Sequence, residues 1–204
     1  MMPLFIQQLI QLISAFFKSR VEPFTITERV AMEIISHEAI VPEAYKDSKG
    51  VWTWGIGVTN ASGHKVNRYK DNPQTIERCL EIFIWLLNTK YVPAVKEAFE
   101  GFTLTEEQFA AALSFHYNTG AIKKASWVRL FKEGKVEEAK ESFMSWKKPP
   151  EIITRRTKEC ALFFEGVWSA EGKATVYDVK KPSYTPNWSS ARTVDITKDL
   201  EKLL

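Results

Sequence analysis

The chain has 204 residues and a mass of 23.5 kDa, which fits one domain with a short appendage rather than a multidomain protein. Apolar residues (45%) suffice for a folded core, while two isolated cysteines and three scattered histidines provide no zinc or dithiol motif, so we expect no metal and no other cofactor. The net charge of +3 is too small to hold a nucleic-acid backbone, so we expect no nucleic-acid partner.

Residues 1–20 are mainly apolar and are interrupted by glutamine, serine and lysine at spacings of three and four. This pattern predicts an amphipathic helix with a wide apolar face. The segment lacks the basic start of a secretory signal and the roughly 18 uninterrupted apolar residues of a spanning helix. We therefore separate an amphipathic segment, 1–22, from the rest of the chain. Either a membrane surface or the protein itself covers its apolar face, and the sequence leaves both open.

A helix is predicted over about 25–39, because Thr25 and Glu28 form a capping box. The apolar residues that follow recur at helical spacing: Val30, Ala31, Ile34 and Ile35. Glu38 falls on the same inward stripe and in the last turn, where the helix dipole disfavours a negative charge. Both effects favour a protonated carboxyl, as a general acid requires, although position alone also fits a frayed helix end with the carboxylate in water.

A β-hairpin is predicted next, with strands at 45–48 and 51–58. Asp47 and Gly50 occupy the first and last positions of a type I turn. A turn aspartate usually binds its own backbone. Here the hairpin follows the helix directly, so Asp47 also places a second carboxylate close to Glu38. One protonated and one ionised carboxyl are what glycoside hydrolysis requires.

Thr53 lies on the second predicted strand, on the face it shares with Gly55 and Gly57. Glycines weaken a strand unless something approaches the backbone closely. Two interpretations remain open. Either a sugar ring lies beside the Thr53 hydroxyl, or the glycines mark a bulged and twisted small sheet.

Beyond the hairpin, the chain is predicted to be helical up to Gly166, with the strongly apolar helix at 73–90 as the central core helix. The predicted helices cover 73–90, 93–101, 105–120, 126–133, 136–147 and 151–165. The tail, 167–204, is rich in lysine, serine, threonine and proline and is expected to be a loosely docked extension with a last helix at 195–204. The fold class is therefore α+β, mostly helical with one small antiparallel sheet.

The spacing of Glu38, Asp47 and Thr53 within HEAIVPEAYKDSKGVWTWGIGVT resembles the Glu–Asp–Thr signature of phage-type lysozymes, the endolysins of glycoside hydrolase family 24. The similarity continues through three later segments: LTEEQFAAALSFHYNTG, FKEGKVEEAKESFMSWKK and TRRTKECALFF. It covers about 25–166, so we expect a catalytic domain at 23–166 followed by the extension 167–204. Four ordered segments make this a specific signal.

The resemblance implies a lysozyme-like fold in which the helix at 73–90 joins a small β-hairpin lobe to a helical lobe. It also implies hydrolysis of the β-1,4 bond between N-acetylmuramic acid and N-acetylglucosamine in bacterial peptidoglycan. Glu38 would be the general acid, while Asp47 and Thr53 would position water or stabilise the transition state. The implied substrate contacts are Thr59, Asn118 and Ser126. Many family members carry a histidine directly after the Gly-x-Gly segment, where this chain has Val58 and then Thr59.

The resemblance further implies a monomer that is made in the host bacterial cytoplasm and acts on the cell wall in the periplasm during phage lysis. Residues 1–20 are the candidate contact with the inner membrane. Two other functions remain open. A lytic transglycosylase would cleave the same bond with one glutamate and no water, so Asp47 and Thr53 would be expendable. A non-catalytic wall-binding or virion structural protein on the same fold would bind peptidoglycan without releasing reducing sugar.

Overall fold

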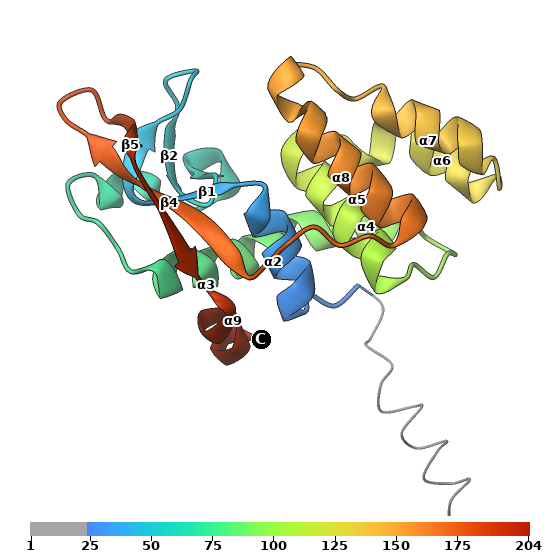
Figure 1. Cartoon of the computed structure of the whole chain (residues 1–204), viewed down its shortest axis with the longest axis horizontal. Coiled ribbons are helices and arrows are strands. Elements are labelled where there is room, and N and C mark those ends of the chain that lie inside the picture. Colours follow the sequence, from blue (N-terminus) through green and yellow to red (C-terminus); the bar gives the residue numbers. More distant parts are fainter. Residues whose placement is uncertain (1–23) are drawn as a thin grey trace, which may run out of the picture.

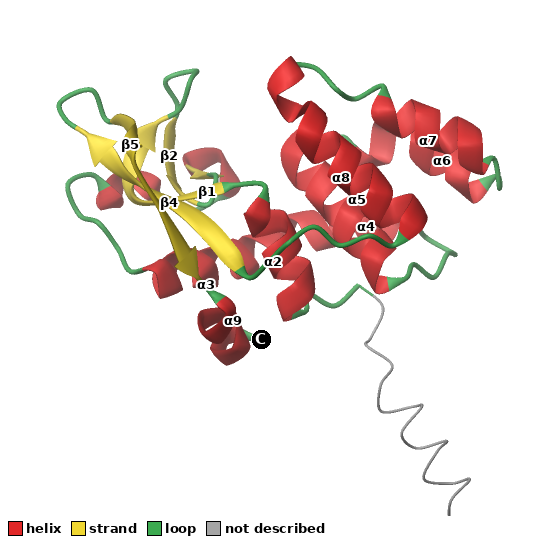
Figure 2. Cartoon of the chain, viewed as in Figure 1, coloured by secondary structure: helices red, strands yellow, loops and turns green. Residues whose placement is uncertain are grey.

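A computed structural model describes residues 24–204 of the chain. The strands gather in one half of the molecule and most of the helices in the other, as Figure 1 and Figure 2 show. We call the residues around the sheet the β-lobe (39–75 and 173–195) and the helices at 92–165 the helical lobe. The expected α+β architecture is thus confirmed. The amphipathic helix predicted within 1–22 lies outside the described residues.

The β-lobe is built on one five-stranded mixed sheet with the strand order β3–β2–β1–β4–β5. The strands are β1 (Ala39–Lys46), β2 (Trp52–Gly55), β3 (Val58–Thr59), β4 (Lys173–Lys180) and β5 (Thr185–Asp195). The predicted hairpin is confirmed as β1 and β2, which pair antiparallel. The second predicted strand breaks after Gly55, because Gly55 (φ +61°) and Gly57 (φ +71°) adopt left-handed backbone that cannot continue an extended strand.

The helices are α2 (Glu28–Ser36), α3 (Ile76–Leu86), α4 (Val92–Ala98), α5 (Glu106–Thr119), α6 (Ser126–Lys132), α7 (Val136–Met144), α8 (Ile153–Glu165) and α9 (Thr197–Leu203). The Thr27 hydroxyl caps α2 by accepting from the N–H of Val30 (3.2 Å), so the cap lies two residues after the predicted Thr25. The same helix ends at Ser36, earlier than predicted. None of the helices in this described part is long and apolar enough to cross a membrane.

The tail at 167–204 differs most from expectation. Instead of docking loosely, it contributes β4 and β5, and β4 runs parallel to β1 with Ala39 beside Thr175. The sheet is therefore mixed and larger than the predicted antiparallel hairpin. Ala174 and Val176 are buried whereas their neighbours are not, which is the period-two pattern of a strand with one covered face. The polar residues of the other face obscure this alternation in the sequence.

Glu33 of α2 fastens the segment that leads from the helical lobe to β4. Its buried carboxylate accepts hydrogen bonds from the N–H groups of Ser169 (2.9 Å) and Ala170 (3.0 Å) and from the Ser169 hydroxyl (2.6 Å). Burial raises the pKa of Glu33, but the neighbouring His37 ring (Nε2 3.5 Å from the carboxylate) and hydrogen bonds from Ser169 and Ala170 outweigh burial and lower the pKa to about 2. An ionised carboxylate therefore ties the tail to α2.

The helix expected at 73–90 starts later and continues further. α3 begins after Thr75 and passes through a π-helical turn, Leu87–Tyr91, directly into α4. Pro93 lies just after this π-helical turn, and its missing N–H cannot continue the regular hydrogen bonds of α3. An uninterrupted helical run nevertheless connects the β-lobe to the helical lobe.

The core of the helical lobe is aromatic. Rings from α5, α6, α7 and α8 meet there: Phe115, Trp127, Phe143 and Phe163. The ring centroid of Trp127 lies 4.8 Å from that of Phe143 and 4.9 Å from that of Phe163. Every residue from Phe109 to His116 in α5 is buried. The centre of this lobe is therefore α5, while the predicted core helix at 73–90 corresponds to α3, which is also largely buried.

Candidate active site

Glu38 lies between the end of α2 and the start of β1, the first strand of the β-lobe. Its backbone N–H donates to the carbonyl of Ile35 (2.9 Å), but the helix has ended at Ser36, so the residue is not in the last helical turn as predicted. The side chain is 23% exposed and forms an ion pair with Arg155 of α8. A guanidinium, and not the end of the helix, is therefore the main charged neighbour of this carboxyl.

Arg155 is itself held from the other side. Its Nε donates to the fully buried carboxylate of Glu159 (2.8 Å), and its Nη2 donates to the carbonyl of Ser114 on α5 (3.1 Å). Burial lowers the pKa of Arg155, but the negative charges of Glu38 and Glu159 outweigh burial and raise it. The guanidinium therefore stays charged, and its orientation is determined by three partners.

Asp47 is the first residue after β1 and begins the hairpin turn. Its Oδ1 accepts from the N–H groups of Lys49 (2.8 Å) and Val51 (2.9 Å), as expected for a turn aspartate. Thr53 pairs directly across the sheet with Tyr45, two residues before Asp47. The hairpin therefore places Asp47 and Thr53 close together at the same end of β1 and β2.

β1 contains a bulge between Glu38 and Asp47. Between Val41 and Tyr45, β1 advances four residues while β2 advances two, so two residues of β1 are accommodated by a bend. Burial raises the pKa of Tyr45, and the negative charges of Glu38 and Asp47 raise it further, so both carboxyls lie within electrostatic reach of one ring. The structure thus places Thr53 opposite Tyr45 and Asp47 two residues beyond it on the hairpin, while Glu38 directly precedes β1.

The two strand glycines contact protein. A Cβ at Gly57 would lie 3.0 Å from the hydroxyl oxygen of Tyr117, which donates to the carbonyl of Ile56. A Cβ at Gly55 would lie 3.6 Å from the Cβ of Cys79 on α3. Helices α3 and α5 therefore occupy the space beside these glycines, so the glycines by themselves do not indicate a sugar ring beside Thr53. Gly57 instead allows α5 to approach the β-lobe.

Asn118 and Ser126 line one cavity of about 640 Å³ in the helical lobe, whereas Thr59 does not. The cavity is lined by Asn118, Thr119, Ser126, Ser145, Trp146, Lys148, Pro149 and Ile152. Thr59 lies on β3 beside Thr53 and contacts Ser62, whose hydroxyl accepts from the Thr59 N–H (3.3 Å). The structure therefore brings two of the three predicted substrate contacts together.

A buried ionic network connects this cavity with Glu38. Arg156 donates to the Oδ1 of Asn118 (2.7 Å) and also to Glu159, which in turn binds Arg155. Sequence reasoning did not single out this network. The signal for it is the spacing in α8: Arg155 and Glu159 are four residues apart on the helix's inward face, where charged side chains must be paired.

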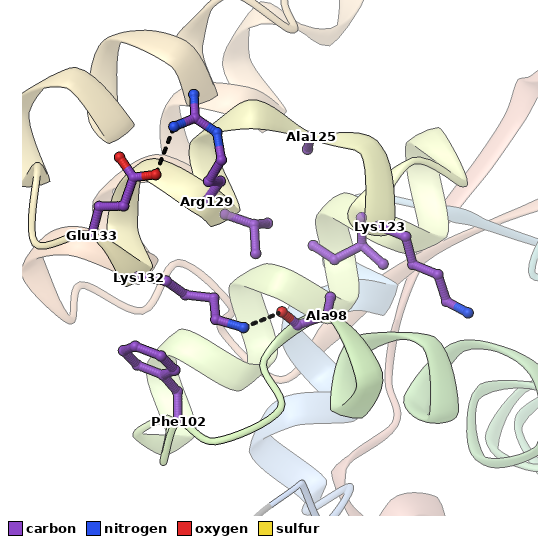
Figure 3. Close-up of a pocket in the computed structure, with 9 residues that line it drawn as sticks. Ala98, Phe102, Lys123, Ala125, Arg129, Lys132 and Glu133 are labelled. Carbon is purple, nitrogen blue, oxygen red and sulfur yellow. Dashed lines mark hydrogen bonds and ion pairs between the residues drawn. The ribbon is translucent and has the colours of Figure 1, made fainter.

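A second cavity, of about 450 Å³, lies between α4 and α6 (Figure 3). Phe102 stands at one side of it, and Lys132 donates to the carbonyl of Ala98 (3.3 Å). The cavity contains none of the predicted site residues. It is therefore separate from the candidate active site. Among residues 24–204, no group of three or more His, Cys, Asp or Glu side chains is arranged to hold a metal ion.

Comparisons with solved structures give lysozyme-like neighbours. The endolysin from Escherichia coli O157:H7 phage FAHEc1 superposes with a TM-score of 0.64 at 22% identity, covering 71% of this chain and 96% of that one. The muramidase domain of SpmX from Asticaccaulis excentricus gives 0.57 at 26% identity, and a mutant of P22 lysozyme gives 0.57 at 25% identity. Each of these two covers 68% of this chain and 97% of the other. No curated protein sequence matches the chain significantly.

The family model described as phage lysozyme matches residues 35–159, which is more than half of the chain. The matched range contains Glu38, Asp47 and Thr53 together with Arg155 and Glu159, and it ends before β4. The expected lysozyme-like fold is confirmed. The chain therefore belongs to the phage lysozyme family, whose members are glycoside hydrolases that lyse peptidoglycan.

Proposed function

We propose that the enzyme hydrolyses the β-1,4 bond between N-acetylmuramic acid and N-acetylglucosamine, with Glu38 as the general acid. The observation that carries this proposal is the placement of Glu38 directly before β1, partly exposed and oriented by Arg155 of α8. A carboxyl held in one orientation can deliver its proton to a defined glycosidic oxygen.

Arg155 favours the state that Glu38 reaches after donating its proton. In the ground state of the reaction Glu38 carries the proton. As the proton passes to the leaving oxygen, the C1–oxygen bond breaks and its electron pair goes to that oxygen. Negative charge then develops on Glu38 beside the guanidinium of Arg155. An interaction that strengthens as this charge develops lowers the barrier.

Asp47 and Thr53 position the attacking water. The Oδ1 of Asp47 serves the turn, so its Oδ2 is the oxygen assigned to the water. The Thr53 hydroxyl donates to the carbonyl of Val51 (3.1 Å), which leaves its oxygen free to accept from the same water. The water oxygen forms a bond to C1 opposite the leaving group, and its proton passes to Asp47. This geometry predicts inversion at the anomeric carbon.

The test is Glu38→Gln, which removes the proton donor without changing the volume. Reducing-end release from purified peptidoglycan should fall by about 10²–10⁴ with an unchanged circular dichroism spectrum. The matched control is Glu28→Gln, an exposed glutamate in the first turn of α2, which should retain full activity. A Glu38→Gln enzyme within a few fold of the parent would overturn the assignment. Products ending in 1,6-anhydromuramic acid would indicate a lytic transglycosylase instead.

We further infer that the residues at 23–166 carry the catalysis, that the enzyme acts as a monomer, and that it is made in the host cytoplasm and reaches the cell wall. Residues 1–20 are proposed to contact the inner membrane, with the protein's own surface as the alternative. Deleting 1–20 should abolish co-sedimentation with anionic liposomes and leave hydrolysis of purified walls unchanged. A deletion variant that instead melts at a lower temperature would assign this segment to the protein's own surface.

A further inference from the structure

Trp188 of β5 is the most exposed large apolar side chain among the described residues, with 68% of its surface in contact with solvent. A tryptophan offers 150–250 Å² of surface, most of it apolar, so leaving it in water forgoes a large burial free energy. It stands on β5, which lies beyond the range that the family model matches. The family fold therefore does not account for this side chain.

The backbone around Trp188 is held in a specific shape. Between the pairs Val176–Arg192 and Asp178–Asn187, β4 advances two residues while β5 advances five, so Trp188 lies in a bulge of β5. The N–H of Asp178 donates to the hydroxyl of Ser190 (2.9 Å), and that hydroxyl donates to the carbonyl of Asn187 (2.7 Å). Bulges redirect side chains, and these hydrogen bonds hold this one in place.

Tyr177 supports the exposed indole. The two rings meet edge to face, with centroids 5.0 Å apart and planes at 79°. Tyr177 also lines a groove of about 470 Å³ between β1, β4, β5 and the start of α3. The indole and the phenol ring therefore form an aromatic surface that continues into a groove.

The groove carries planar polar groups beside these rings. Arg192 forms an ion pair with Asp178 (2.7 Å) across β4 and β5, and both side chains are about half exposed. Glu43 of β1 and Gln74 line the same groove. Aromatic faces with a few convergent donors and acceptors suit a ligand that has an apolar face and a hydroxylated rim. Sugar rings have this chemistry, and peptidoglycan is the polymer on which the family acts.

We propose that Trp188, Tyr177 and the adjoining groove bind a segment of a peptidoglycan glycan strand through its N-acetylated sugar rings. This proposal rests on the proposed function in one respect, which is the choice of peptidoglycan as the ligand. β5 is at the sheet edge, three strands from the β2 that carries Thr53, and the β4–β5 hairpin projects away from the helical lobe in Figure 1. The groove is lined by none of Glu38, Asp47 and Thr53, so the site binds glycan outside the candidate active site and raises the local concentration of glycan there.

The experiment measures binding of the full chain to purified sacculi by sedimentation on ice. Trp188→Ala should raise the Kd about three- to tenfold, the loss expected for one aromatic contact, while Trp188→Phe should retain most of the affinity. The matched control is Trp85→Ala, which removes another exposed tryptophan, 41% exposed on α3, and should leave the Kd unchanged. Hydrolysis of a short soluble oligomer of N-acetylglucosamine should be the same in all of these proteins.

A second readout does not depend on the stability of the variants. The indole N–H resonance of Trp188, assigned by its loss in Trp188→Phe, should shift when tetrameric N-acetylglucosamine is added to the wild-type chain. An unshifted resonance together with an unchanged Kd in Trp188→Ala would overturn the proposal. A dimer that becomes a monomer in Trp188→Ala would assign this surface to self-association instead. Reducing-end release tests the proposed cleavage, whereas the Kd and the Trp188 resonance test glycan binding. Either proposal can therefore fail without the other.

Discussion

The core of the helical lobe and the tip of the β4–β5 hairpin are stabilised by different interactions. In the helical lobe, large rings from four helices form a dry core around Trp127. In the β-lobe, the tip of the β4–β5 hairpin is held by exposed polar contacts, in which Lys181 binds Glu43 and Asp71 and the hydroxyl of Tyr184 donates to Asp71 (2.9 Å). Closely packed rings stabilise the fold together, so disturbing one ring affects its neighbours. Each exposed polar contact, by contrast, contributes little to the free energy of unfolding.

The candidate active site takes residues from both lobes. The β-lobe provides Asp47 and Thr53 on a hairpin, and the helical lobe provides the buried pair of Arg155 and Glu159. Glu38 directly precedes β1 and forms an ion pair with Arg155 of α8. The helical lobe thus positions Glu38 through a buried charged side chain, whereas the β-lobe contributes Asp47 and Thr53 on a short hairpin. The following substitutions test this difference.

The largest effect is expected for Glu159→Gln. It leaves two buried guanidinium groups, those of Arg155 and Arg156, without a full counter-charge, so the free energy of unfolding should fall by about 3–5 kcal/mol. Urea denaturation measures the change. The control is Glu165→Gln. Glu165 lies on α8, like Glu159, but its ion pair with Lys140 of α7 is exposed, so the unfolding midpoint should be unchanged. Equal midpoints for the two variants would contradict the role of the buried network.

Glu33→Gln should have the next largest effect. The neutral amide weakens the hydrogen bonds to Ser169 and Ala170, so unfolding at pH 7 should be easier by about 2–3 kcal/mol. The pKa of Glu33 is about 2 in the folded chain against an ordinary value of 4.5. Its contribution is therefore present above pH 4.5 and is lost as the pH falls towards 2. The wild type and the variant should converge in stability over that range, and a constant difference would disprove this linkage.

Gly57→Ala tests the contact between α5 and the β-lobe. Its positive φ alone should cost about 1–2 kcal/mol in stability, and a Cβ would also press on Tyr117. Gly134→Ala is the matched control, since φ is +75° there and nothing lies within 4 Å of the added carbon. We expect kcat/KM on purified walls to fall several fold for Gly57→Ala only. Equal activity in both variants would show that the contact does not position the site.

The smallest effect is expected for Tyr184→Phe. The substitution removes the hydroxyl that donates to Asp71 but keeps the ring, which packs edge to face on Trp52 with centroids 5.4 Å apart. A single exposed polar contact contributes little, so thermal unfolding should shift by less than about 3 °C. A larger shift in a melting experiment would show that the polar tip of the hairpin stabilises the β-lobe as strongly as a packed core would.

Features with local causes were predictable from the sequence. The turn from Asp47 to Gly50 depends on residues within four positions of one another, and the capping box of Thr105 and Gln108 begins α5 as expected. The family was likewise evident from a short segment, through the spacing of Glu38, Asp47 and Thr53. The cap of α2 was misplaced because Thr25 and Thr27 both precede the helix, and only the backbone decides which of them faces its first turn.

Features that depend on distant partners were decided by the tertiary structure. The ion pair of Glu38 and Arg155 joins residues 117 positions apart, and the pairing of β4 with β1 is equally remote in sequence. The sequence by itself determined the family, the helices and the hairpin, because capping, turn chemistry and periodicity act within a few residues. Only the folded chain decided which charges share a buried network and that the polar tail completes the sheet. Both outcomes depend on which surfaces meet, and that depends on the packing of the whole molecule.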